Sequence, residues 1–99
     1  MLDPAKEAAL LSSAIRDYGR GVISQADLRA VVDSIIERWR TAPESAKPPL
    51  QPEEAPLWHA VWEIELACRE ALAPDGVQVH LRYLSGELPL RGTATPMRP

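Results

Sequence analysis

Ninety-nine residues, of which 45% are hydrophobic and 25% charged, are typical of one small folded domain and too apolar for a wholly disordered chain. A net charge of −3 excludes the strong positive field of a general nucleic-acid binder, and a single cysteine excludes an internal disulfide. A domain of this size buries only somewhat over ~60% of the surface of its unfolded chain, so a deep active-site cleft is hard to build without a second subunit.

A first helix is expected over residues 4–18. Asp3 followed by Pro4 is typical of a helix start, because the carboxylate accepts from the free first-turn amides and proline needs no partner there. Gly19 and Gly21 end the helix, since glycine readily adopts the left-handed conformation of a C-terminal cap. Apolar residues recur at helical spacing at Leu10, Leu11, Ala14, Ile15 and Tyr18.

A second helix is expected from Ser24 to about Arg40, with Asp27 in the acidic position of a capping box. Its apolar stripe consists of Leu28, Val31, Val32, Ile35 and Trp39. The short spacer between the two segments predicts an antiparallel helical hairpin over residues 1–40.

Residues 41–56 form a proline-rich connector, because five prolines forbid a continuous helix. Such a segment either binds a partner or packs on the surface, and packing of the proline rings and Leu50 over the core is favoured. The third helix is expected over residues 56–73. Its stripe of Leu57, Val61, Ile64, Cys68 and Leu72 is widened by Trp58, Trp62 and Leu66.

Residues 75–90 allow two structures. Alternation of apolar side chains over residues 77–83 fits a β-hairpin at 77–91, whereas Val77, Leu81, Leu84 and Leu88 also fit a helical stripe. We favour a short helix capped by Asp75, because the Y-x-x-G pattern at Tyr83 repeats the one that ends the first helix at Tyr18. Residues 91–99 lack apolar periodicity and are expected to be a flexible tail.

The tryptophans of the third helix are the main candidates for a partner interface. Trp58 and Trp62 can build the core of a protein without phenylalanine, or they can anchor a partner together with Leu66. Asp33 and Glu37 of the second helix and Glu63 of the third can either keep the surface hydrated or form an acidic patch that docks into a basic site.

No motif predicts catalysis or a cofactor. His59 and Glu63 are spaced i, i+4, but neither H-E-x-x-H nor a paired-cysteine motif accompanies them, so no metal site is expected. Cys68 lies on the apolar stripe, where a thiol stays protonated and acts as a small hydrophobe. No glycine-rich phosphate loop is present either.

The segment at residues 15–28 contains the turn Gly21-Val22-Ile23-Ser24. It resembles small bacterial helical proteins of the colicin D immunity-like type, in which a helix ends in a G-x-I-S turn and a second helix begins. The resemblance implies a compact helical inhibitor that occludes the active site of a toxin with acidic residues. It assigns no individual binding residue.

Together these patterns predict a single all-α domain, a bundle of three long helices and a short fourth element. We expect a cytoplasmic protein without membrane contact, since no apolar run approaches the ~20 residues of a membrane span. Its expected function is non-catalytic binding of a protein partner or of a second copy. The alternatives are a subunit of a larger complex, an enzyme without cofactor across a dimer interface, or a small DNA-binding regulator. The last would use arginines of the helical hairpin, at Arg16, Arg20, Arg29, Arg38 and Arg40.

Overall fold

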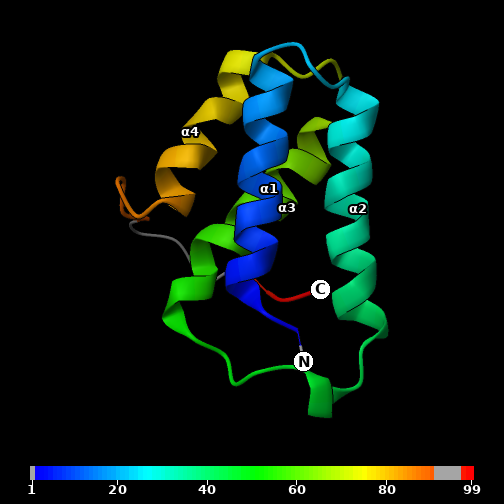
Figure 1. Ribbon diagram of the computed structural model, residues 1–99, viewed down its shortest axis with the longest axis vertical. Helices are drawn as coiled ribbons and strands as arrows, with labels where there is room; N and C mark the ends of the chain where they lie inside the picture. The colour runs from blue at the N-terminus through cyan, green and yellow to red at the C-terminus, as the bar shows by residue number, and fades with distance from the viewer. Residues whose placement is uncertain (1, 91–96) are drawn as a thin grey trace.

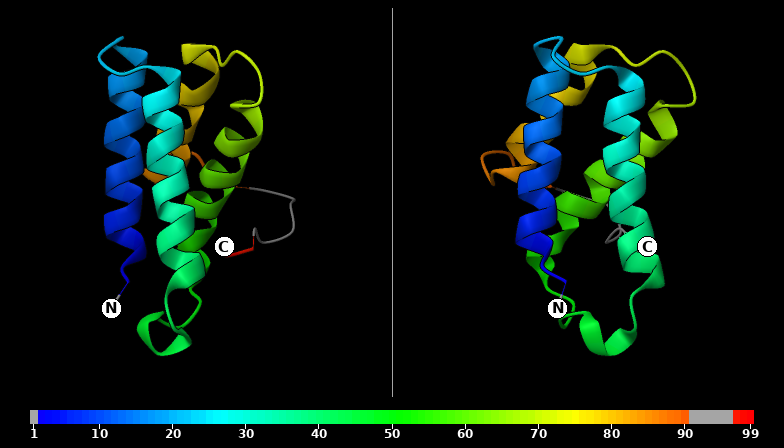
Figure 2. Two further views of the ribbon diagram at one scale, coloured as in Figure 1. Left: turned by 90° about the vertical axis from the view of Figure 1, so that its right-hand side faces the viewer. Right: turned by 45° about the vertical axis from the view of Figure 1, so that its right-hand side comes forward.

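The computed structural model describes residues 2–90 and 97–99, and over these residues the protein is an all-α bundle without strands. Four helices, α1 (Pro4–Gly19), α2 (Gln25–Thr41), α3 (Ala55–Ala67) and α4 (Pro74–Leu84), alternate in direction (Figure 1). Each helix contacts the next along the chain, and α4 returns to contact α1. Figure 2 shows α1 and α2 in one layer and α3 and α4 in the other. The predicted all-α fold is confirmed.

The α1–α2 hairpin forms as its caps predict. The Asp3 carboxylate accepts from the Ala5 amide at 3.0 Å, and Ser24 and Asp27 form a reciprocal capping box. Gly21 has φ of 73°, the left-handed conformation that lets the chain turn between the two helices. The ion pair between Glu7 and Arg38 joins α1 to α2 on one side of the hairpin.

The connector contains two short 3₁₀ turns, η1 (Glu44–Ala46) and η2 (Pro52–Glu54). It passes the start of the described chain, where the Leu2 amide donates to the Ala46 carbonyl at 2.9 Å. Leu50 does not cover the core as expected, since it is mostly exposed. The side chain that the connector buries is instead the carboxylate of Glu54, directly before α3.

Helix α3 ends at Ala67, six residues before the expected end at 73. The Gln25 side chain donates to the Glu70 carbonyl at 2.7 Å and accepts from the Leu72 amide at 2.8 Å, and the Tyr18 hydroxyl donates to the Leu72 carbonyl. These contacts satisfy main-chain groups of the α3–α4 connection outside a helix, so residues 68–73 cross to the α1–α2 turn instead of extending α3.

Residues 74–84 form the helix α4, and the alternative β-hairpin at 77–91 does not form over its described residues. The helix starts with Pro74 after Ala73, so the expected Asp75 cap is not used. Gln78 of α4 donates to the Ile15 carbonyl at 3.1 Å, which fastens α4 to α1. Gly86, with φ of 80°, ends this region as Gly21 ends α1.

All four helices contribute to one core. Its largest fully buried side chains are Trp39, Trp58, Leu11, Ile15, Leu28, Ile35, Leu57, Ile64, Val32, Val61 and Val77. In the part of the chain that the structure describes, no helix is long and apolar enough to span a bilayer.

Candidate functional site

Trp39 of α2 and Trp58 of α3 pack edge to face, with ring centroids 4.9 Å apart and planes at 77°. Both are fully buried, so Trp58 is not the surface residue that the interface prediction requires. The reason is its position one turn after the start of α3, where its ring faces α2 and its indole N–H can reach back to Glu54. Trp58 therefore belongs to the core.

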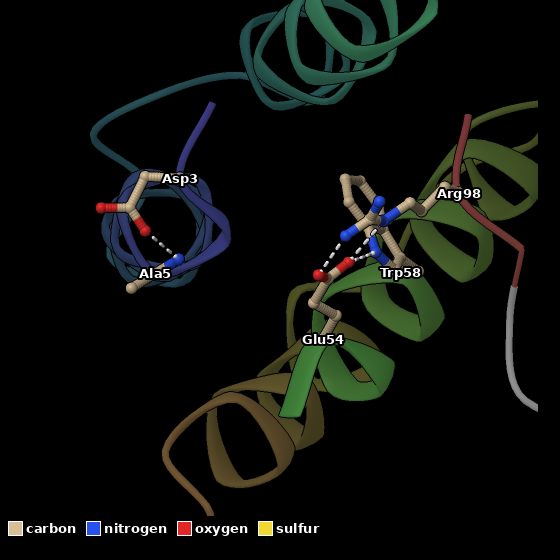
Figure 3. Close-up of polar contacts among 5 residues, drawn as sticks. All are labelled: Asp3, Ala5, Glu54, Trp58 and Arg98. Carbon is tan, nitrogen blue, oxygen red and sulfur yellow. Dashed lines mark hydrogen bonds and ion pairs between the residues drawn. The ribbon is translucent and has the colours of Figure 1, made fainter. Parts of the chain in front are cut away.

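Glu54 has a buried carboxylate, only 2% exposed, at the start of α3 (Figure 3). It accepts from Trp58 Nε1 at 2.9 Å and from Arg98 Nε at 2.7 Å, and Arg98 Nη2 donates to its second oxygen. The fork of the guanidinium thus meets both carboxylate oxygens, the geometry that makes arginine the preferred partner of a carboxylate.

Two further contacts hold the segment 97–99. The guanidinium carbon of Arg98 lies 5.1 Å from the ring centroid of Trp39, within range of a cation–π interaction. Trp62 Nε1 donates to the Met97 carbonyl at 2.6 Å. We refer to Trp39, Glu54, Trp58 and Trp62, which together hold this segment against α2 and α3, as the arginine cleft.

Segment 97–99 corrects the prediction of a flexible tail over residues 91–99. The part at 91–96 lies outside the described residues, but Met97 and Arg98 make specific contacts in the arginine cleft. Periodicity could not reveal this, because the segment is held by one charged side chain and one main-chain carbonyl and not by an apolar stripe.

The electrostatics of the arginine cleft depend on its occupant. Burial alone would raise the pKa of Glu54, but hydrogen bonds from Arg98 and Trp58, the charge of Arg98 and the Gln51 amide hold the pKa below its ordinary value. The same hydrogen bond from Arg98 to Glu54 raises the pKa of Arg98. Glu54 is therefore a buried anion whose charge is compensated by segment 97–99.

The other residues of the predicted interface lie in three places: on the outer side of α3, on the exposed side of α2, and on the flank of α3 that borders α4. Trp62 is half-buried and Leu66, one turn later on α3, is 56% exposed. Asp33 and Glu37 lie on the exposed side of α2, where Asp33 faces Arg29 at 3.7 Å. The charge of Asp33 acts on the Cys68 thiol, so Asp33 lies near the end of α3, and Glu37 follows one turn later on α2.

Glu63 is turned away from the carboxylates of α2. Its carboxylate lies 4.0 Å from His59 Nε2, and its charge acts on His80 of α4. It thus borders the opposite flank of α3. We define the outer α3 face as Trp62, Leu66 and the neighbouring Met97, whose side chain is 80% exposed.

A cluster of aromatic side chains lies between α3 and α4. The rings of His59 and His80 are 5.4 Å apart, and Tyr83 is 5.5 Å from His59. Burial lowers the pKa of His80, the nearby His59 lowers it further, and Glu63 acts in the opposite direction. His59 is therefore partly covered, and the helical form of residues 74–84 is what brings His80 to it.

The described residues contain no group of three or more His, Cys, Asp or Glu side chains placed to hold a metal ion. Cys68 is buried at the end of α3, and burial raises the pKa of its thiol, with Asp33 and Glu65 adding to this effect and Arg29 opposing it. At neutral pH the thiol is protonated, as its place on the apolar stripe predicts.

A pocket of about 620 Å³ lies between the start of α1, the connector and the start of α3. Its wall is mainly apolar, with Ala5, Ala8 and Leu57 among its residues, and also includes the residues Asp3 and Glu54. Figure 3 shows both carboxylates bound to groups of the chain itself. None of the pocket-lining residues is among the buried side chains without a partner in the described chain.

Comparison with protein-family models, with curated proteins and with solved structures finds no match for this sequence. The site therefore has to be interpreted from its own geometry. Sequence reasoning proposed Trp62 and Leu66 as interface residues, which stays a prediction, and it missed Glu54, Trp39 and Arg98 as one group. The one local signal was the i, i+4 spacing of Glu54 and Trp58.

Proposed function

We propose that this protein is a non-catalytic protein–protein interaction module, most concretely an immunity- or antitoxin-like inhibitor. It meets its partner through the outer α3 face and the carboxylates of α2 beside it. The observation that carries the proposal is the exposure of Leu66 and Met97 next to the half-buried Trp62. An aromatic ring with exposed apolar neighbours is a common anchor of protein interfaces.

The charges around this face support an electropositive partner surface. Among the described residues, Glu37 has no ion pair, and the pair of Asp33 with Arg29 is long at 3.7 Å and half exposed. Weak surface pairs contribute little to stability, so these carboxylates can exchange their present contacts for those of a partner. Complementary charge would then increase the association rate and select the partner. Glu63 would extend the contact on the other flank of Leu66.

The arginines favour this function over DNA binding. A regulator that uses the helical hairpin needs arginines such as Arg38 to reach phosphate, and Arg38 is held by Glu7 in a partly buried ion pair. The exposed carboxylates of Asp27, Asp33 and Glu37 on the same hairpin would also repel phosphate. We therefore expect no retardation of duplex DNA in a gel shift at ~150 mM salt, where non-specific contacts are already weak. Sequence-specific retardation at micromolar protein would instead support a regulator.

Photo-crosslinking in the native cell tests the proposed surface. A photoreactive phenylalanine analogue replaces Leu66 in one variant and Leu50 in the control, since both side chains are more than half exposed and Leu50 lies in the connector, before the opposite end of α3. We expect a discrete crosslinked partner from position 66 only. Equal products from both positions, or none from position 66, would contradict the surface.

The identified partner then allows a quantitative test. Trp62→Ala should weaken the complex by about 2 kcal/mol or more if Trp62 is a hot spot. Glu37→Arg should slow association and reverse its salt dependence. For an inhibitor, co-expression must relieve the toxicity or block the activity of the partner, and Glu37→Arg must reduce that protection. A partner whose activity is unchanged in the complex would leave a binding module that is not an inhibitor.

A further inference from the structure

We propose that the arginine cleft is a receptor for an arginine-bearing extended segment of a protein partner, and that segment 97–99 occupies it as an internal competitor. The inference rests on the proposed function, because it assigns the chemistry of the partner that the module binds. It adds a second contact beside Leu66, and Trp62 belongs to both contacts. Trp62 and Leu66 stay on α3 when Met97 leaves with segment 97–99.

The cleft recognises arginine by two direct contacts and one supporting hydrogen bond. The carboxylate of Glu54 accepts from two nitrogens of the guanidinium, and the guanidinium carbon lies 5.1 Å from the centroid of the Trp39 ring. The indole of Trp58, bound to the same carboxylate at 2.9 Å, keeps that carboxylate in place. A lysine ammonium cannot form the two-point contact or stack flat on an indole, so the cleft distinguishes arginine from lysine.

The cleft also binds the main chain of its occupant. Trp62 Nε1 donates to the Met97 carbonyl at 2.6 Å, a contact that any residue before an arginine can provide. Met97 itself is 80% exposed, so its side chain adds little to the binding. Recognition therefore needs one arginine and one preceding carbonyl, and a partner segment with the same two groups fits the same cleft.

The burial of Glu54 explains why the cleft does not stay empty. A carboxylate that is 2% exposed requires a positive partner, because its desolvation is otherwise uncompensated. Segment 97–99 provides that partner in the free protein. Indole Nε1 of Trp39 is buried without an acceptor among the described residues, so segment 97–99 leaves one donor of the cleft unused. When an arginine of the partner replaces Arg98, the Glu54 carboxylate again has a positive partner.

The first test uses the full wild-type chain, labelled with ¹⁵N, and the unlabelled peptide N-acetyl-Met-Arg-Pro-amide. A tethered segment competes at an effective concentration of the order of millimolar, so ~10 mM peptide should displace about nine tenths of it. The Arg98 Nε–H signal, protected by Glu54, should then disappear while the Trp58 indole signal stays in place. N-acetyl-Met-Lys-Pro-amide at the same concentration should leave the Arg98 signal intact. Persistence of that signal with the arginine peptide, or its equal loss with both peptides, would overturn the receptor.

The second test measures competition. In Arg98→Ala the cleft is vacant, and the arginine peptide should bind about tenfold more tightly than to the wild type and restore the wild-type indole shifts of Trp58 and Trp62. Circular dichroism controls for folding. If this variant unfolds, Arg98→Lys, which keeps the charge and loses the fork, replaces it with the same expectation. Failure of both to bind the arginine peptide would refute the receptor, even where the crosslink at position 66 still identifies a partner.

The third test identifies the occupant. A partner captured through position 66 should bind Arg98→Ala about tenfold more tightly than the wild type, since the internal competitor is gone. Unchanged or weaker binding would overturn the competition. If the wild type instead becomes dimeric with rising concentration and keeps its protected Arg98 signal, the occupant is segment 97–99 of a second copy, which also contradicts the assignment to a partner.

Discussion

Two arginine–glutamate ion pairs stabilise this bundle, and they differ in how far water reaches them. Arg38 binds Glu7 at 3.1 and 2.5 Å between α1 and α2, much as Arg98 binds Glu54. The side chains of Arg38 and Glu7 are 40% and 10% exposed, whereas those of Arg98 and Glu54 are 19% and 2% exposed. The same chemical contact is thus partly hydrated in one place and nearly dry in the other.

The comparison shows that a charge pair is indispensable where water cannot solvate the charge that remains when one partner is removed. Water can solvate Arg38, and to a lesser degree Glu7, if the first pair is broken. Glu54 has no such replacement, since it lies under the indoles of Trp39 and Trp58. The dry pair also joins the more distant parts of the chain, 44 residues apart against 31 for Arg38 and Glu7. A single side chain of segment 97–99 therefore controls the electrostatics of the core beside α3.

The largest effect is expected for Arg98→Ala. Removal of the guanidinium leaves the buried carboxylate of Glu54 without its counter-charge, which should lower the free energy of unfolding by about 3 kcal/mol. Urea denaturation followed by circular dichroism measures it. The apolar double variant Glu54→Met with Arg98→Met should recover most of the loss, because it removes both charges together. If Arg98→Ala lowers the free energy of unfolding less than Arg38→Ala does, the pair of Arg98 and Glu54 is not the more important of the two.

Arg38→Ala is expected to have a smaller effect. Glu7 keeps limited access to water, so the loss should be about 1 kcal/mol, near that of a partly exposed pair. Raising the salt concentration should reduce the difference between wild type and Arg38→Ala more than that between wild type and Arg98→Ala, since ions screen hydrated pairs more effectively. Equal salt dependence at both sites would show that they share one dielectric environment.

Local sequence rules predicted the helices, but they did not predict the ion pair between Arg98 and Glu54. Capping residues such as Asp3 and Ser24, and apolar stripes at a helical period, were sufficient for the all-α fold. The end of α3 could not be predicted, because Gln25 and Tyr18, distant in sequence, bind the main chain of residues 70–72. Tertiary contacts there outweigh local helix propensity.

The residues of the candidate site also differ in how far the sequence could predict their positions. Leu66 widens the apolar stripe of α3, and its helical position did not predict that it is 56% exposed. Helical position alone does not separate Trp58 from Trp62, since they lie one turn apart and both border that stripe. Their difference is set by Glu54 and by segment 97–99, and the approach of Arg98 to a residue 44 positions away carries no periodic signal.

His80, between α3 and α4, and Glu54 affect stability in different ranges of pH. Because burial holds the pKa of His80 below its unfolded value, its effect on stability is absent above about pH 6.5, and stability is lost as the pH falls from there through the folded pKa. Glu54, whose pKa is also lowered, stabilises the fold above the ordinary carboxyl range and loses this effect only at more acidic pH.

Unfolding free energy measured against pH separates these two regions. His80→Phe should remove the decline that begins near pH 6.5, whose slope for one proton is at most ~1.4 kcal/mol per pH unit, and leave the acidic limb unchanged. The groups around His80 are His59 and Glu63 of α3 and Tyr83 of α4. His59→Phe is therefore the matched control, and it should reduce the decline without abolishing it. An unchanged profile in His80→Phe would place the responsible proton elsewhere.

The smallest effect is expected for Trp62→Phe, which keeps an aromatic ring on α3 and removes only the hydrogen bond from Nε1 to the Met97 carbonyl. A single hydrogen bond between partly hydrated groups contributes ~0.5–1 kcal/mol, so global unfolding should hardly change. The local effect should be clearer, since this bond and the Glu54 contacts together hold segment 97–99. Exchange of the Arg98 Nε proton with water should accelerate about two- to fivefold, as that free energy implies. If exchange is unchanged while Arg98→Ala still destabilises the fold, the guanidinium alone holds the segment, and the carbonyl of Met97 has no part in recognition.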